Sequence, residues 1–107
     1  MQVWKFRLAP PGMTQRIEMP AGAEILHCAI QHHAPQLWAL VDQAREKEER
    51  LFITLGTGHE FEPPPNTNAL HRGTYFQDDG HFVWHVFELA PRVKVTPLIN
   101  TSMPNRF

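Results

Sequence analysis

The stretch TYFQDDGHFVWHVFEL, residues 74–89, decides the fold class of this chain. Its centre, Asp79-Gly80, is typical of a two-residue hairpin loop, in which both central residues take positive φ. The flanking residues have the composition and alternation of two antiparallel strands. The turn sets Asp78 opposite His81, and the same register predicts three further pairs: Phe76 with Val83, Tyr75 with Trp84, and Thr74 with His85.

Further short strands precede this hairpin. Alternating residues predict strands in VWKFRL (3–8) and TQRIEMP (14–20), and LFITL (51–55) predicts another. EILHCAIQ (24–31) and QLWALVD (36–42) are apolar on both faces, which predicts two strands in the middle of the structure, joined by a short hairpin at HHAP. With no long amphipathic helix, the pattern predicts an all-β fold, a small antiparallel sandwich or barrel of about six or seven short strands.

Two segments depart from the strand pattern. REKEER (45–50) is a charge run, typical of a solvated loop or one helical turn between strands. After Leu89 the sequence is rich in proline, so we predict a single β domain over residues 1–89 and an irregular C-terminal extension over residues 90–107. Within that extension RVKV (92–95) is either an edge strand, able to pair with a second subunit, or part of a loose arm.

Composition disfavours several partners. The formal net charge is −1, so the chain has no basic excess to neutralise a phosphate backbone, and a nucleic-acid partner is disfavoured. The single cysteine, Cys28, cannot form an internal disulfide. No apolar run approaches the roughly 20 residues that cross a bilayer. We therefore expect a cytoplasmic protein with no membrane partner.

Histidine spacing gives no support for a metal site. His81 and His85 have the i, i+4 spacing of a helical metal motif. On a strand, however, four residues span about 13 Å, too far for both side chains to reach one zinc ion. The chain has seven histidines, so a site assembled from the distant residues His27, His59 and His71 stays an alternative.

Catalytic groups are also sparse. The only serine, Ser102, lies in the proline-bearing tail, and Cys28 lies among apolar residues whose burial would leave its thiol inert. Glu60 and Glu62 would share one face of an extended segment, with Asp42 near them, as paired carboxylates for acid–base chemistry would. Without a pocket such carboxylates are solvated charges. We assign no catalytic residue, no metal ligand and no cofactor.

The run GTGH, residues 56–59, is the leading candidate for a binding site. Successive N–H groups around its two glycines, with a threonine hydroxyl and an imidazole beside them, can bind an anion. The same glycines are explained equally by a strand-ending turn with no ligand. Two tryptophans would add stacking faces for a ligand or a partner. The predicted binding residues are Gly56, Thr57, Gly58, His59, Trp38 and Trp84.

Several motifs of this chain together resemble a family of small uncharacterised bacteriophage and prophage proteins. They occur in the family's order over about residues 3–88: VWKF, IEMPAGAEILH, QLWALVD, Glu49 to Phe52, GTGH, and HRGTYF followed by GHFVWHVFE. The resemblance implies a phage origin, and hence the cytoplasm of a bacterial host, without implying an activity. The chain departs from the family at QAREKEER, where members often carry a proline-containing loop, and residues 90–107 lie beyond the resemblance.

Three functions are compatible with these residues. The leading hypothesis is a non-enzymatic phage accessory protein that binds a host macromolecule, for example a host-defence inhibitor. The second is a protein that binds or sequesters a small anionic, nucleotide-like ligand through GTGH. The third is an enzyme that uses histidines and carboxylates. A homodimer formed through an edge strand or the tail is compatible with each of them.

Overall fold

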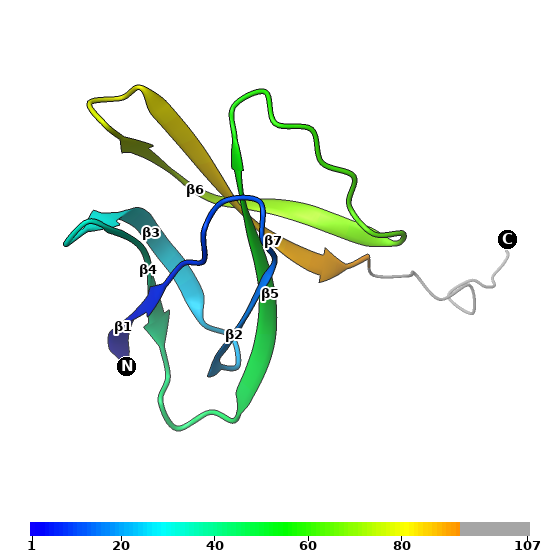
Figure 1. Cartoon of the computed structure of the whole chain (residues 1–107). Helices are drawn as coiled ribbons and strands as arrows, with labels where there is room; N and C mark the ends of the chain where they lie inside the picture. The colour runs from blue at the N-terminus through cyan, green and yellow to red at the C-terminus, as the bar shows by residue number, and fades with distance from the viewer. Residues whose placement is uncertain (93–107) are drawn as a thin grey trace, which may run out of the picture.

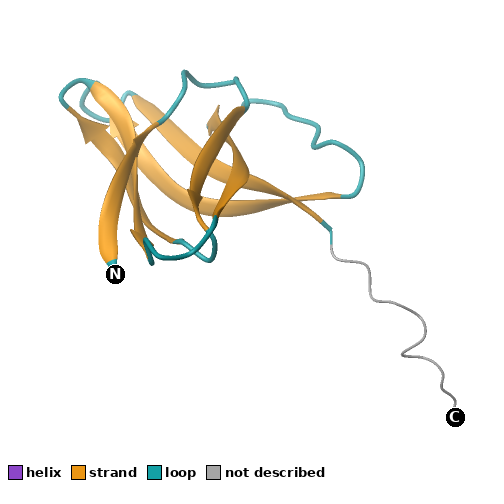
Figure 2. Cartoon of the chain, turned by 90° about the horizontal axis from the view of Figure 1, so that it is seen from below, coloured by secondary structure: helices purple, strands orange, loops and turns teal. Residues whose placement is uncertain are grey.

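The computed structural model describes residues 1–92, which form two antiparallel β-sheets (Figures 1 and 2). One sheet has the strand order β1-β4-β3 and the other the order β2-β5-β7-β6. The all-β prediction is confirmed, and residues 1–92 contain no helix that could cross a membrane. The strands are β1 (Gln2–Arg7), β2 (Gln15–Pro20), β3 (Glu24–Gln31), β4 (Ala34–Val41), β5 (Lys47–Gly56), β6 (Thr67–Gln77) and β7 (Phe82–Pro91).

The predicted β6–β7 hairpin is confirmed in its register. The observed pairs include Thr74 with His85, Tyr75 with Trp84, and Phe76 with Val83. At the turn the His81 N–H donates to the Asp78 carbonyl over 3.0 Å. The last strand pair is Gln77 with Phe82, so the predicted pairing of Asp78 with His81 is wrong and residues 78–81 form the loop. Asp78, Asp79 and Gly80 all have positive φ, of 56°, 54° and 84°, because the Asp-Gly turn extends into Asp78.

The core lies between the two sheets. On the inner face of β4 the side chains of Leu37, Ala39 and Val41 are fully buried, and Phe52 and Val86 face them from the four-stranded sheet. Each large side chain buried in this way contributes about 1.5–3 kcal/mol. The other buried members of the cluster are Leu8, Ile17, Met19, Ala23, Cys28 and Tyr75.

The two sheets approach each other closely where β3 passes β6. The pairing of β6 with β7 shifts register between His71 and Gly73, and a Cβ on Gly73 would lie 2.9 Å from the Cys28 Sγ. Only glycine allows this approach. Cys28 is buried, as expected, and burial raises the pKa of its thiol to about 11.

The charge run is the main correction to the sequence-based fold. Residues 47–50 belong to β5, because that strand begins at Lys47, and they are neither loop nor helix. Arg50 pairs in register with the buried Ile17, so its side chain points between the sheets and is only 12% exposed. A local charge pattern does not reveal this inward position, because it is set by pairing with a distant strand.

Arg50 holds a buried carboxylate. Its Nε and Nη2 donate to the two oxygens of Glu88 over 2.7 and 2.8 Å, and its Nη1 donates to the Ala23 carbonyl over 2.6 Å. Arg72 donates from Nε to the same carboxylate over 2.9 Å. Burial alone would raise the pKa of Glu88, but its bonds to the two guanidinium groups lower it overall. The hydrogen bond to Glu88 in turn raises the pKa of Arg50.

Other boundaries differ from the sequence prediction. The strand of residues 24–31, expected in the middle, is an edge strand of the three-stranded sheet, and Leu26 and His27 on it are exposed; only β4 is central there. β6 begins at Thr67 rather than at residue 74, and β7 continues past Leu89 to Pro91. The predicted extension beyond Arg92, including most of RVKV, lies outside the described residues.

The turn between β3 and β4 is unusual in its sequence. Gln31 pairs with Ala34, so the loop consists of His32 and His33 alone. Their φ values are 53° and 66°, in the left-handed region that asparagine and glycine adopt most readily. A non-glycine residue held there costs about 1–3 kcal/mol. The predicted short hairpin is present, but its two histidines are strained.

The buried carboxylate predicts an acid-sensitive fold. The folded pKa of Glu88 lies below its ordinary value of 4.5. Its ion pairs therefore stabilise the fold fully above that value, and their contribution is lost as the pH falls toward the lowered folded pKa. We expect Glu88→Gln to cost about 3–5 kcal/mol at pH 7, because Arg50 then remains buried without its counter-charge. Urea unfolding from pH 7 down to about 3, a range that includes the ordinary carboxyl pKa of about 4, measures both effects.

The matched control is Glu49→Gln. Glu49 forms an exposed ion pair with Arg16 over 3.9 Å, and such pairs contribute about 0–1 kcal/mol. Equal losses of stability in the two variants would contradict a special role for Glu88.

Candidate functional site

The GTGH run forms a tight turn at the end of β5. The His59 N–H donates to the Gly56 carbonyl over 3.0 Å, and Gly58 has a φ of 83°. The Thr57 N–H donates to the Val83 carbonyl over 3.3 Å, which ties the turn to β7. The turn is therefore held against the β6–β7 hairpin.

Gly56 makes room for the ring of Trp84. The two residues pair across β5 and β7, and a Cβ on Gly56 would lie 2.9 Å from a carbon of that ring. The Trp84 Nε1–H donates to the Gln77 side-chain oxygen over 2.8 Å. Phe82 stacks on Trp84 with ring centroids 5.9 Å apart and an interplanar angle of 12°. Trp84 is thus fixed by contacts on three sides.

A hollow of about 300 Å³ joins three of the predicted binding residues, Gly56, Thr57 and Trp84, to His81, Phe82 and Val83. Few backbone donors face a ligand here. The N–H groups of Thr57 and His59 already donate to backbone carbonyls. Among the backbone bonds of residues 1–92, the Gly58 N–H between them has no acceptor. A concavity of successive free N–H groups, as an anion requires, is therefore not formed by this turn.

The remaining predicted residues lie elsewhere. His59 lines a separate apolar hollow of about 220 Å³ with Leu55, Phe61 and Phe87. Trp38 belongs to the three-stranded sheet and lies beside His27, with ring centroids 6.0 Å apart. The structure thus brings Trp84 and the GTGH turn together and places Trp38 on the other sheet.

A chain of hydrogen bonds crosses the outer face of the four-stranded sheet. His85 Nε2 lies 2.7 Å from the Thr57 hydroxyl, and its Nδ1 lies 3.2 Å from the Thr74 hydroxyl. The Thr74 hydroxyl also lies 2.9 Å from His71 Nε2. One arrangement satisfies every group: His85 Nδ1–H donates to Thr74, and the two hydroxyls donate to the remaining ring nitrogens. The sequence predicted one contact of this hydrogen-bond chain, the pairing of Thr74 with His85 across the hairpin.

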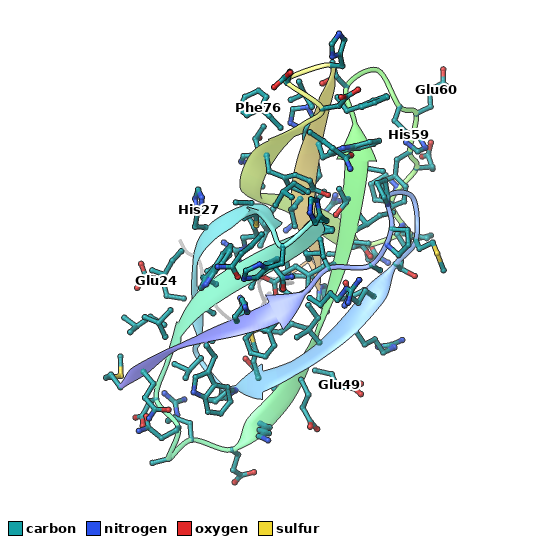
Figure 3. The ribbon with its side chains drawn as sticks, turned by 60° about the vertical axis from the view of Figure 1, so that its left-hand side comes forward. Glu24, His27, Glu49, His59, Glu60 and Phe76 are labelled. Carbon is teal, nitrogen blue, oxygen red and sulfur yellow. The ribbon has the colours of Figure 1, made fainter. Side chains whose placement is uncertain are left out.

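Aromatic side chains project from the tip of the β6–β7 hairpin. Phe76 is 63% exposed and Phe82 is 49% exposed. Because they occupy adjacent register pairs, they lie on opposite faces of the hairpin. Figure 3 shows Phe76 at the same end of the molecule as His59 and Glu60, far from Glu49. The alternating sequence pattern could not show that these two phenylalanines are exposed, because buried aromatic residues of a strand give the same pattern.

The candidate catalytic and metal groups remain apart. Asp42 precedes β5 and Glu60 follows it, so this strand separates them by roughly 30 Å. Across residues 1–92 no three His, Cys, Asp or Glu side chains gather as metal ligands. His81 and His85 lie in a turn and on a strand rather than on one helix.

Comparison with known proteins places the chain in a family. It belongs to a family described as a domain of unknown function (DUF7352), which matches residues 1–96. No curated protein and no solved structure matches the chain at a significant level. The expected membership of an uncharacterised family is therefore confirmed.

The contact between Gly56 and Trp84 yields a direct prediction. Gly56→Ala places a Cβ against the ring and displaces it, which we expect to cost about 1–3 kcal/mol, as overpacking does. The Trp84 indole N–H resonance should shift while those of Trp4 and Trp38 stay in place. Gly58→Ala is the control, because a Cβ there meets no atom within 4 Å and adds only backbone strain. An unmoved Trp84 resonance in Gly56→Ala would contradict this packing.

Proposed function

We propose that this chain is a non-enzymatic binding module that inserts the tip of its β6–β7 hairpin into an apolar cleft of a protein partner. The observation that carries the proposal is the exposure of Phe76 and Phe82 on the two faces of one tip. Exposed aromatic residues gathered on a small surface are typical of protein interfaces. A tip with an aromatic side chain on each face matches a cleft better than a flat surface.

The tip is also ordered before binding. The Asp-Gly turn closes it with a backbone hydrogen bond of 3.0 Å, and Phe82 is stacked on a Trp84 that Gln77 holds in place. A preformed surface loses little conformational entropy on association. The aromatic groups therefore favour binding more than the same residues on a mobile loop would.

The negative charge at the hairpin tip favours one class of protein surface as its partner. Asp78 and Asp79 are exposed at the turn, between the two strands that carry the phenylalanines. Their carboxylates favour a cleft with basic side chains at its rim. The same charges repel a phosphate backbone, which supports a protein partner over a nucleic acid.

The source of the partner follows from the sequence resemblance. The resemblance to phage and prophage proteins supports a host protein as the partner, in the bacterial cytoplasm, and inhibition of a host defence is one such role. A homodimer stays a prediction, since β1, β2, β3 and β6 are all edge strands of their sheets.

A second candidate is the binding of a small anionic ligand beside the GTGH turn. The hollow of about 300 Å³ that joins Gly56, Thr57 and Trp84 favours it, because the indole ring could stack on a base. The engaged N–H groups of the turn weigh against it. We place it second for that reason, and the separated carboxylates place the enzyme hypothesis third.

The hairpin proposal predicts the effect of a double substitution. Phe76→Ala with Phe82→Ala should weaken binding at least tenfold, since truncating a central aromatic residue of an interface costs about 2 kcal/mol or more. The partner is first captured from host lysate and identified by mass spectrometry. Its affinity is then measured by calorimetry with the purified protein.

The control replaces two exposed apolar residues outside the hairpin, Met13 and Leu26, by alanine. We expect this variant to bind within about twofold of the wild type, because rim and non-interface residues contribute little. Equal weakening in both double variants, or unchanged binding by the hairpin variant, would exclude the tip as the interface.

A further inference from the structure

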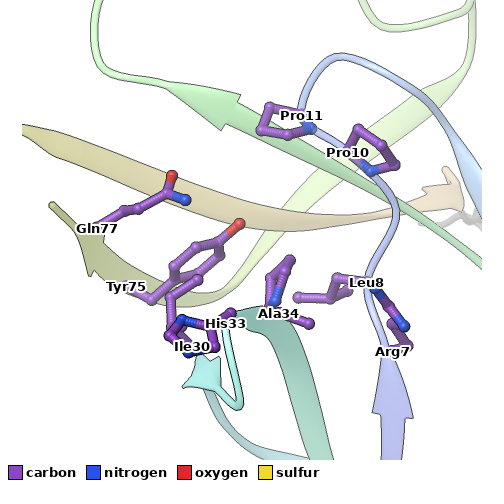
Figure 4. Close-up of a pocket in the computed structure, with 10 residues that line it drawn as sticks. Arg7, Leu8, Pro10, Pro11, Ile30, His33, Ala34, Tyr75 and Gln77 are labelled. Atoms are coloured by element: carbon purple, nitrogen blue, oxygen red, sulfur yellow. The ribbon is translucent and has the colours of Figure 1, made fainter.

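A further cavity, separate from the two hollows described above, lies between the two sheets and plays no part in the proposed hairpin interface (Figure 4). Its volume is about 260 Å³, near the lower limit of about 300–1,000 Å³ for ligand sites. It therefore suits a small molecule. Most of its wall is apolar, made by Leu8, Pro10, Pro11, Ile30, Ala34 and Pro35.

Two polar groups from β6 converge on this cavity. Figure 4 shows the Tyr75 ring and the Gln77 side chain extending from β6 on the side opposite Pro10 and Pro11. The Gln77 oxygen already accepts the Trp84 Nε1–H over 2.8 Å, which leaves the amide NH₂ as a donor. The Tyr75 hydroxyl is protonated at neutral pH, since burial raises its pKa to about 12 although a hydrogen bond with the Thr54 side chain acts to lower it, and the hydroxyl can donate. The cavity thus offers hydrogen-bond donors beside an apolar wall.

The strained turn of β3 and β4 contributes to the same cavity. His33 lines it, and both His33 and His32 are held at positive φ. Asparagine or glycine would make this turn without strain. This backbone conformation fixes the direction in which the His33 side chain leaves the turn. The His33 imidazole and the Arg7 guanidinium also line the cavity and add further donors.

We propose that this cavity binds a small organic anion with an apolar ring, of the size of an arylacetate. The ring would lie against Leu8, Ile30 and Pro35, and the carboxylate would accept hydrogen bonds from Gln77 and Tyr75, with His33 beside it. An apolar wall with a few convergent donors is the usual construction of such a site. The site requires no protein partner, although its Gln77 also accepts the hydrogen bond from Trp84 of the hairpin.

The test is a titration with phenylacetate, followed by the amide and side-chain resonances of the full chain. We expect saturable shifts at Ile30, Tyr75 and Gln77. Gln77→Glu keeps the acceptor for the Trp84 indole but replaces the donor by a negative charge, and should weaken binding at least tenfold, the effect of about 1.4 kcal/mol. No saturable shift at these residues with the wild type, or shifts confined to another surface, would overturn the proposal.

A matched control exists on β1. The Gln2 side-chain oxygen accepts the Trp4 Nε1–H over 2.8 Å, just as Gln77 does for Trp84. Gln2→Glu therefore adds the same charge to the same kind of contact away from the cavity, and phenylacetate affinity should stay within about twofold of wild type, about 0.4 kcal/mol. Equal weakening in both glutamate variants would show a general charge effect and refute the site.

Two further measurements separate the roles of strain and charge. His33→Gly should raise Tm, because glycine relieves the positive φ, while weakening phenylacetate binding several-fold. A raised Tm with unchanged binding would remove His33 from the site.

Phenylacetamide, which carries the same ring without the charge, should bind more weakly than phenylacetate. Equal affinities would refute an anion as the ligand.

Discussion

The buried carboxylate of Glu88 fixes the register on which the rest of the four-stranded sheet depends. It lies on β7, between Arg50 of β5 and Arg72 of β6, and accepts hydrogen bonds from both. Taking these charges out of water costs several kcal/mol per ion unless they are paired. A slip of β7 by one residue would turn Glu88 to the outer face and leave both guanidinium groups without their counter-charge. That penalty holds β7 in place and sets Trp84 opposite Gly56.

The turn residues of the β6–β7 hairpin made the pairing of these two strands predictable from the sequence. The Asp79-Gly80 turn specifies its own geometry, so the hairpin register followed from residues next to each other in the chain. The inward position of Arg50 did not, because its partner Glu88 lies 38 residues away and no local pattern connects them. The start of β6 was missed for a related reason: residues 67–73 lack alternation, and their pairing shifts register between His71 and Gly73, where Gly73 packs against the distant Cys28. Local residue propensities therefore predict turns well but predict poorly which distant strands pair with each other.

The same distinction applies to the candidate site. The sequence predicted Gly56 and Trp84 as binding residues from their types alone. Their pairing across β5 and β7 shows a different role for the glycine, which leaves room for the indole ring. Trp38 was chosen on the same grounds and lies on the other sheet. The cavity beside His33 could not be found from sequence, because its walls come from three separate parts of the chain. Its one local signal was the pair of histidines at a two-residue turn that ordinarily favours asparagine and glycine.

The hairpin surface and the cavity share one side chain. Gln77 lines the cavity and holds Trp84, on which Phe82 stacks. A ligand that draws the Gln77 amide toward itself must strengthen or weaken that single bond to the indole. Coupling between two sites is reciprocal, and here it cannot exceed the contribution of one hydrogen bond, about 0.5–1.5 kcal/mol. If both proposals hold, the two surfaces would act as weakly coupled sites, and filling the cavity would change the affinity of the hairpin for its partner by roughly tenfold at most.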